Sequence, residues 1–271
     1  MSMTAYERVK IARSEKRPTG LDYINNIFKT FYEFHGDRFY ADDTAIVGGI
    51  AYLEKMPVTV IAIEKGHSAK ERAFRSFGMP NPEGYRKALR LMKQAEKFSR
   101  PVICLVDTPG AFCGLEAEER GQGEAIARNI YEMSGLRVPV VSIIIGEGGS
   151  GGALAMATSD EVWMLENSIY SILSPEGFAS ILWKDASRAG EACEVMKLTA
   201  ADLLAYQVID GIIPEPEGGA HTDPAAAAAA VDQALCAALD RLKKLNGPAL
   251  AQHRYQKFRA MGDPAGKKER A

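Results

Sequence analysis

The sequence has no long apolar run and few cysteines, and each shortage excludes a class of protein. No stretch of the 271 residues stays apolar long enough to span a bilayer, so we expect no membrane association. The 4 cysteines are scattered and lack zinc-site spacing, which predicts a reduced, cytoplasmic protein with no metal on this chain. A net charge of −2 gives no reason to expect nucleic acid as a partner.

A phosphate-binding P-loop is also missing. The segment Asp107-Thr108-Pro109-Gly110 is similar to a GTPase switch motif, but no Gly-x-x-x-x-Gly-Lys-Ser/Thr sequence accompanies it. Histidine is scarce too, with 4 in the chain. His35 stands beside a turn glycine, where a structural role is commoner than a catalytic one, and neither role is excluded.

The apolar pattern predicts a single α/β domain in which strands alternate with helices. We expect a basic arm or end helix over 1–17, the domain over 18–262 and a polar tail over 263–271. The strands are expected at 44–52, 58–64, 101–107, 138–145, 162–165, 170–173 and 208–213. The main helices are expected at 21–34, from 83, from 150 to 158, at 191–196, at 200–206, from 223 to 244 and from 248 to 259.

The most informative segment is 146–152, Gly-Glu-Gly-Gly-Ser-Gly-Gly. It follows the apolar run 138–145, typical of a buried strand, and precedes an alanine-rich segment that favours a helix. This glycine turn therefore has almost no side chains and leaves backbone N–H groups accessible at the positive end of a helix. Such groups stabilise negative charge, whether bound or developing during a reaction.

Several interpretations fit these glycines, including a structural one in which they only allow close strand–helix packing. The spacing of Gly146, Gly148 and Gly151 matches a dinucleotide fingerprint, with Glu166 near the position of a ribose-binding acid. The helix expected at 150–158 is short for the crossover helix of that fold, which weakens the dinucleotide interpretation.

Gly148-x-Ser150-x-Gly152 also matches a nucleophile elbow with Ser150 as the attacking hydroxyl. That interpretation needs a later histidine, and the chain offers His221 in a loop-like segment and His253 in a basic helix. A third interpretation is an oxyanion hole built from backbone amides. It needs a second turn nearby, which 107–110 provides.

A series of segments, in order over most of residues 17–262, is similar to one known family. The segments are 35–38 (HGDR), 77–88 (FGMPNPEGYRKA), 107–111 (DTPGA), 117–122 (AEERGQ), 145–152 (IGEGGSGG), 174–177 (SPEG), 212–216 (IIPEP) and 218–221 (GGAH). On these residues the chain resembles the alpha subunits of bacterial acetyl-coenzyme A carboxylase carboxyltransferase.

The resemblance implies an α/β crotonase-like (ClpP/crotonase) fold, a spiral of ββα units with C-terminal helices. It implies carboxyl transfer from carboxybiotin, carried on a biotinyl carrier protein, to acetyl-CoA, giving malonyl-CoA for fatty acid synthesis. It also implies a beta subunit that supplies a zinc ribbon and most coenzyme A contacts. An alpha2beta2 heterotetramer working with biotin carboxylase is expected, and the alpha subunit alone is expected to be inactive.

The resemblance further implies which residues act. The backbone amides of Gly151 and Gly152 would hold the oxyanion of biotin, and the partner would hold the thioester enolate. Biotin's own nitrogen would be the base, so the protein orients a reaction that the cofactor carries. The residues expected to shape the site are Gly148, Gly149, Gly110 and Ala111.

Some positions depart from the family pattern. Phe112 and Cys113 stand where Tyr-Pro is expected, and Glu116 and Phe178 stand where small residues are expected. Cys113 has no histidine beside it in the sequence, so a loop substitution explains it better than a nucleophile. The departures leave open a paralogue for another acyl-CoA. Separate alternatives are a Ser150-dependent hydrolase on a related fold and a non-catalytic scaffold.

Overall fold

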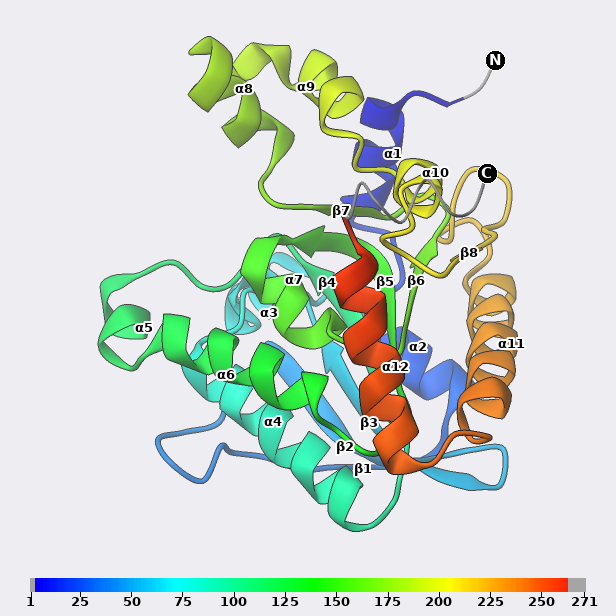
Figure 1. Cartoon of the computed structure of the whole chain (residues 1–271). Helices are drawn as coiled ribbons and strands as arrows, with labels where there is room; N and C mark the ends of the chain where they lie inside the picture. The colour runs from blue at the N-terminus through cyan, green and yellow to red at the C-terminus, as the bar shows by residue number, and fades with distance from the viewer. Residues whose placement is uncertain (1–2, 263–271) are drawn as a thin grey trace.

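The structure, a computed structural model, describes residues 3–262 of the chain. Its centre is a mixed β-sheet with helices on both faces (Figure 1). Within the described residues the sheet has eight strands in the order β1-β2-β3-β4-β5-β6-β8, and β7 pairs with β5. The strands are β1 (Lys29–Glu33), β2 (Ile46–Leu53), β3 (Met56–Ile63), β4 (Val102–Thr108), β5 (Val140–Gly149), β6 (Glu161–Leu165), β7 (Ile169–Ser171) and β8 (Gly211–Ile213).

The sheet begins antiparallel and continues parallel. Only Glu54 and Lys55 join β2 to β3, and so short a connection permits only antiparallel pairing. The pairs β3–β4, β4–β5 and β5–β6 are parallel because a helix in each connection returns the chain to the same edge. The strands predicted at 44–52, 58–64 and 101–107 are confirmed, with each boundary within one or two residues.

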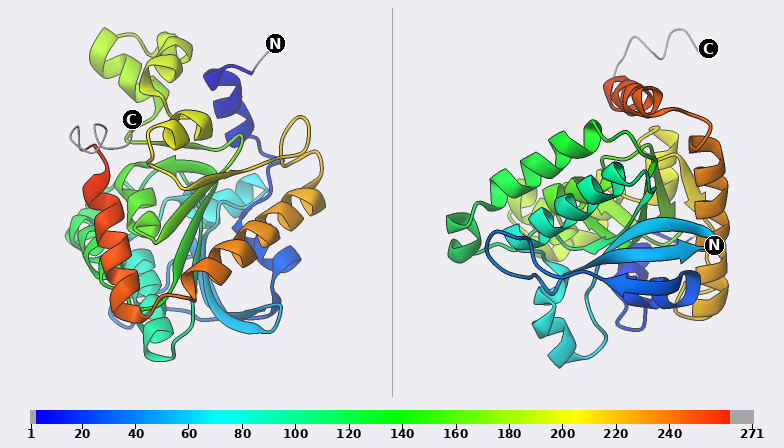
Figure 2. Two further views of the ribbon diagram at one scale, coloured as in Figure 1. Left: turned by 45° about the vertical axis from the view of Figure 1, so that its right-hand side comes forward. Right: turned by 90° about the horizontal axis from the view of Figure 1, so that it is seen from below.

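Helices cover both faces of the sheet (Figure 2). Helices α2 (Gly20–Ile27) and α11 (Pro224–Leu242) pack on one face, and α4 (Pro82–Lys97), α6 (Gln122–Ser134) and α7 (Ser150–Ala157) pack on the other. Each face has its own buried apolar cluster, so the sheet is the middle layer of three. The remaining helices are α1 (Ala5–Ala12), α3 (Ala69–Phe74), η1 (Ser76–Gly78), α5 (Leu115–Glu119), α8 (Pro175–Trp183), η2 (Ala186–Arg188), α9 (Ala189–Met196), α10 (Ala200–Ala205) and α12 (Gly247–Ala260). None of the helices within 3–262 combines the length and apolar character needed to cross a membrane.

Two sequence-based boundaries are wrong, and sheet pairing explains both. The helix predicted over 21–34 ends at Ile27, because the segment that follows pairs with β2 as strand β1. The strand predicted to end at Ile145 continues to Gly149, because Glu147 to Gly149 pair with β7. Most of the predicted glycine turn is therefore strand, and the chain turns sharply between Gly149 and α7.

The N-terminal segment is bound to the sheet rather than loose. After helix α1, Arg17 is 3% exposed and donates from Nε to the carbonyl oxygen of Ile145 at 2.7 Å. Its guanidinium also forms an ion pair with Glu215 at 2.6 Å. Burial alone would raise the pKa of Glu215, but Arg17 outweighs it and lowers that pKa. The polar tail predicted at 263–271 lies outside the described residues.

The last helix is fastened by a buried arginine. Arg254 of α12 is fully buried and donates to the carbonyl oxygens of Met133 at 2.5 Å and Leu136 at 3.0 Å. It also pairs with the fully buried Asp160 at 2.7 Å. This ion pair joins α12 to the segment that leads into β6, so the C-terminal helix is an integral part of the fold.

Candidate active site

Two turns meet where the parallel strands β4 and β5 end: one at 109–111, after β4, and one at 149–150, between β5 and α7. A Cβ added at Gly149 would overlap the carbonyl group of Pro109. A Cβ added at Gly152 would lie 2.6 Å from the amide nitrogen of Ala111 and 2.8 Å from the carbonyl carbon of Gly110. Only glycine at both positions lets the two turns touch. The second turn that the oxyanion-hole interpretation requires is therefore present beside the first.

The predicted site glycines divide into packed and open positions. Gly148 lies within β5, and a Cβ there would lie 2.8 Å from the ring of Tyr170. By contrast, a Cβ at Gly151 would meet only Ile126, at 3.5 Å. Gly110 has a φ of +152° and would have no neighbouring atom within 4 Å of its Cβ. A side-chain atom would thus fit at Gly110 and Gly151 but not at Gly148.

The start of α7 supplies amides that the helix itself cannot use. Helix α7 begins at Ser150 without a side-chain cap. The N–H groups of a first helical turn have no intrahelical acceptor, and Gly151 and Gly152 belong to that turn. They lie at the positive end of the helix dipole, where an oxyanion is stabilised.

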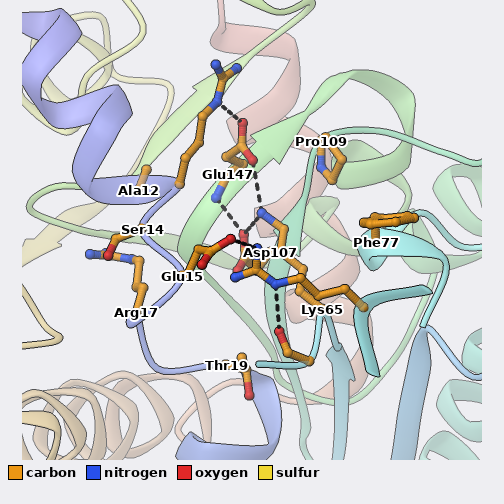
Figure 3. A pocket seen from close by; sticks show the side chains of 13 residues that line it. Ala12, Ser14, Glu15, Arg17, Thr19, Lys65, Phe77, Asp107, Pro109 and Glu147 are labelled. Carbon is orange, nitrogen blue, oxygen red and sulfur yellow. Dashed lines mark hydrogen bonds and ion pairs between the residues drawn. The ribbon is translucent and has the colours of Figure 1, made fainter. Parts of the chain in front are cut away.

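A cluster of charged side chains backs the two turns (Figure 3). The Lys65 ammonium lies 2.7 Å from Asp107 and 2.9 Å from Glu147. Arg13 contacts the other oxygen of Glu147 at 2.7 Å. The backbone N–H of Glu147 donates to Asp107 Oδ1 at 2.8 Å. These residues line a pocket of about 220 Å³ together with Pro109.

The charges in this cluster keep one another ionised. Burial alone would lower the pKa of Lys65, but Asp107 and Glu147 outweigh it and raise that pKa. Burial would likewise raise the pKa of Glu147, but Lys65 and Arg13 lower it. These shifts favour the charged forms of Lys65 and Glu147, so the cluster is an ion-pair network rather than a proton-transfer site.

Sequence reasoning missed this network. Lys65 lies just before a basic stretch that contains Lys70 and Arg72, and Arg13 lies in the predicted N-terminal arm, so neither was predicted as a site residue. The available signal was positional, since Lys65 and Asp107 close neighbouring strands and Glu147 lies inside the glycine segment. Side chains at the carboxyl ends of adjacent parallel strands converge, which is where α/β proteins form their sites.

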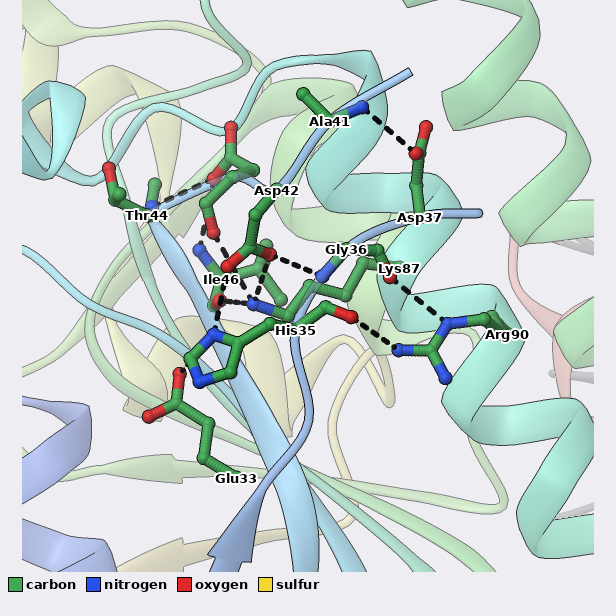
Figure 4. Close-up of polar contacts among 12 residues, drawn as sticks. Glu33, His35, Gly36, Asp37, Ala41, Asp42, Thr44, Ile46, Lys87 and Arg90 are labelled. Carbon is green, nitrogen blue, oxygen red and sulfur yellow. Dashed lines mark hydrogen bonds and ion pairs between the residues drawn. The ribbon is translucent and has the colours of Figure 1, made fainter. Parts of the chain in front are cut away.

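The structure does not support a serine hydrolase. Ser150 is exposed with a φ of +53°, as a nucleophile elbow requires, but no hydrogen bond joins its hydroxyl to a histidine among residues 3–262. His35 does not contact Ser150. Its Nδ1 lies 2.9 Å from Asp42 Oδ2 in a surface loop (Figure 4). Within the same residues no group of three or more His, Cys, Asp or Glu side chains is arranged to hold a metal.

Comparison with known proteins identifies the family of this chain. The family described as acetyl co-enzyme A carboxylase carboxyltransferase-like matches residues 1–262. An acetyl-coenzyme A carboxylase carboxyl transferase subunit alpha from Clostridium acetobutylicum is 61% identical over 260 residues, which cover 96% of this chain and 95% of the relative. A Natranaerobius thermophilus protein named for subunits beta/alpha is also 61% identical over 260 residues, 96% of this chain, but these span only 43% of its length. Among solved structures, transcarboxylase 12S with methylmalonyl-coenzyme A bound has a TM-score of 0.69 at 20% identity, over 85% of this chain and 43% of that one.

The fold is that of the crotonase-like carboxyltransferases, as predicted. More specifically, the chain belongs to the acetyl-coenzyme A carboxylase carboxyltransferase family. The family inferred from the sequence motifs is therefore confirmed, and with it the class of enzyme, a carboxyl-transferring subunit.

Proposed function

We propose that this chain acts as an alpha subunit that transfers a carboxyl group from carboxybiotin to acetyl-CoA, giving malonyl-CoA. The observation that carries the proposal is the contact between the two turns beside the uncapped start of α7. Fixed amides at that position stabilise negative charge on an oxygen without any titrating side chain. This agrees with a site in which no histidine is bonded to Ser150.

In this proposal the amides of Gly151 and Gly152 hold the charged oxygen. Carboxybiotin, carried on its carrier protein, supplies the activated carboxyl group and a ureido oxygen that accepts hydrogen bonds. The residues fit such a group, because a side chain is missing at Gly151 and the space beside Gly110 is open. The remaining residues proposed to shape the site are Gly148, Gly149 and Ala111.

Exposed apolar residues support a protein partner. The segment containing α8 and α9 projects from the body of the molecule (Figure 1). It carries Ile172, Ile181, Leu182 and Val195, which are 55–78% exposed. Large exposed apolar patches mark interaction sites, and the Natranaerobius thermophilus relative is named for beta and alpha subunits in one chain. We infer a beta-type partner with a zinc ribbon in an alpha2beta2 heterotetramer, served by biotinyl carrier protein and biotin carboxylase.

The remaining inferences concern extent, substrate and location. Residues 18–262 are proposed as the carboxyltransferase domain, onto which α1 packs. Acetyl-CoA is the proposed acyl substrate, and the departures at Phe112, Cys113 and Phe178 make a paralogue the competing proposal. Cytoplasmic localisation stays a prediction from the scattered cysteines.

The test is co-expression of this chain with a beta-type subunit, followed by an assay of malonyl-CoA-dependent carboxylation of free biotin. The complex is expected to be active and each subunit alone inactive. A panel of malonyl, methylmalonyl and longer carboxyacyl-CoA esters identifies the acyl group. A complex that assembles but transfers carboxyl groups from none of them contradicts the proposal and favours a scaffold.

A further inference from the structure

Among residues 3–262, Lys65 is the only cation that forms ion pairs with both Asp107 and Glu147. Asp107 lies in the last two residues of β4, before the turn at 109–111, and Glu147 lies in β5, two residues before Gly149. Because the Lys65 ammonium lies 2.7 Å from the first carboxylate and 2.9 Å from the second, it joins the ends of the two strands that lead into the turns. A single side chain therefore links the ends of β4 and β5, the strands that lead into the two turns.

The backbone at 76–78, which lies beside Lys65, has an unusual conformation. Ser76, Phe77 and Gly78 have successive φ values of +48°, +55° and +74°. A Cβ at Gly78 would lie 2.5 Å from Lys65 Cγ and 3.1 Å from the carbonyl oxygen of Asp107. Left-handed backbone at two non-glycine residues costs roughly 1–3 kcal/mol each and persists only where surrounding structure enforces it. Gly78 therefore lies close to both the aliphatic stem of Lys65 and the end of β4.

The network also reaches beyond the turns. Arg13 contacts Glu147 at 2.7 Å and Glu176, in the first turn of α8, at 2.8 Å. Glu147 therefore has a cation on each carboxylate oxygen, which leaves the side chain no freedom to rotate. Its backbone N–H is occupied by Asp107, so both the side chain and the main chain of this residue are fixed.

We propose that Lys65 is a positioning residue. It sets the distance between the two turns and therefore the position and direction of the backbone N–H groups of Gly151 and Gly152. The inference rests on the proposed function, because the amides matter only if they hold a charged oxygen. Misplacing a reacting group by about 1 Å costs on the order of 10²-fold in rate. Removing Lys65 leaves two adjacent carboxylates without their shared cation, and their repulsion drives the turns apart.

Lys87 provides a matched control (Figure 4). It is a buried lysine, with its ammonium 2.8 Å from Asp42 and 2.8 Å from the carbonyl oxygen of Ile46. Neither partner belongs to the two turns. Lys65→Met and Lys87→Met each remove an ion-paired lysine, partly buried and bound to two carboxylates in the first case, fully buried and bound to one in the second. Both are expected to lose stability, but only Lys65 contacts the strand ends that lead into the two turns.

The experiment measures kcat, KM for malonyl-CoA and hydrogen exchange in the assembled complex of this chain with its beta-type partner. We expect Lys65→Met to lower kcat by about 10- to 100-fold with KM changed less than threefold, and Lys87→Met to lower kcat less than threefold. Lys65→Arg keeps the charge and is expected to recover part of the lost kcat. Equal losses in the two methionine variants, or no loss in either, would overturn the proposal.

Hydrogen exchange separates this inference from the proposed function. Amides over 147–153 are expected to exchange faster in Lys65→Met than in Lys87→Met, whether or not the complex transfers carboxyl groups. An inactive wild-type complex with this exchange pattern refutes the proposed function and supports the positioning role. Unchanged exchange in an active complex refutes the positioning role alone. If Lys65→Met does not fold, Lys65→Gln, which removes the charge and keeps a polar side chain, replaces it, and wild-type kcat and exchange in that variant count against the proposal.

Discussion

Gly152→Ala and Gly151→Ala place the same methyl group one residue apart, with opposite expected effects. At position 152 the methyl carbon would lie 2.6 Å from the amide nitrogen of Ala111, and at position 151 it would lie 3.5 Å from Ile126. Ordinary contacts begin near 3.4 Å, so the first variant must displace the turn at 110–111 by about 0.8 Å. The second variant needs no displacement.

The expected energies follow from these distances. Overpacking of this kind costs about 1–3 kcal/mol, and each kcal/mol shifts the Tm of a domain this large by roughly 2–4 °C. Gly151→Ala replaces a helical glycine by a better helix former at a position with room, and is expected to gain about 0.4–1 kcal/mol. For Gly152→Ala, displacement of the turn is also expected to lower kcat by about 10- to 100-fold.

Thermal unfolding of the two variants, measured at the same concentration in the same buffer, gives the comparison. Gly152→Ala is expected to melt below wild type, and Gly151→Ala at or above it. If Gly152→Ala melts with Gly151→Ala and keeps wild-type kcat in the complex, the contact between the two turns does not constrain the site. The assignment of packed and open glycines would then be wrong.

Three further outcomes follow from the structure. Ser150→Ala is expected to keep carboxyl transfer within threefold of wild type in the biotin carboxylation assay, whereas a serine hydrolase would lose all activity. Burial alone would raise the pKa of Asp42, but Lys87 and neighbouring donors hold it at about 2. The ionised Asp42 therefore stabilises the fold above pH 4, near the pKa of this side chain in the unfolded chain, and this contribution is lost as the pH falls towards 2. Unfolding free energies of wild type and Asp42→Asn are therefore expected to converge between pH 4 and pH 2 in urea titrations. Arg254→Met leaves Asp160 buried without its cation and is expected to cost about 3–5 kcal/mol in the same titrations, and the added Asp160→Asn change is expected to recover part of that loss.

Much of the architecture could be predicted from the sequence because it is encoded locally. The apolar run before the glycines, the alanine-rich segment after them and the short β2–β3 connection all predict their elements correctly. The motifs, taken in order, predict the family correctly. What failed depends on distant pairing: β1 is a strand only because β2 is beside it, and Gly146 to Gly149 extend β5 partly because β7 lies alongside.

The site shows the same limit. Six backbone positions were predicted from the resemblance, but which glycines are packed and which are open depends on how the turn at 109–111 approaches them. The distance between that turn and the glycines cannot be read from the sequence around either segment. Lys65 was likewise hidden, because its partners lie 42 and 82 residues further along the chain. Its two ion pairs become visible only when the strand ends are brought together.

The anchoring of the N-terminal segment bears on how this protein is prepared. Trimming the chain to start at residue 18 would remove Arg13 and Arg17 at once. Glu215, whose side chain is fully buried, would then face the protein interior with no counter-charge, and the carbonyl oxygen of Ile145 would lose its donor. Glu147 would keep only one of its two cations. A shortened protein of this kind is poorly suited to testing whether the enzyme is active. Its inactivity would reflect the lost ion pairs of Arg13 and Arg17 rather than the absence of catalytic groups.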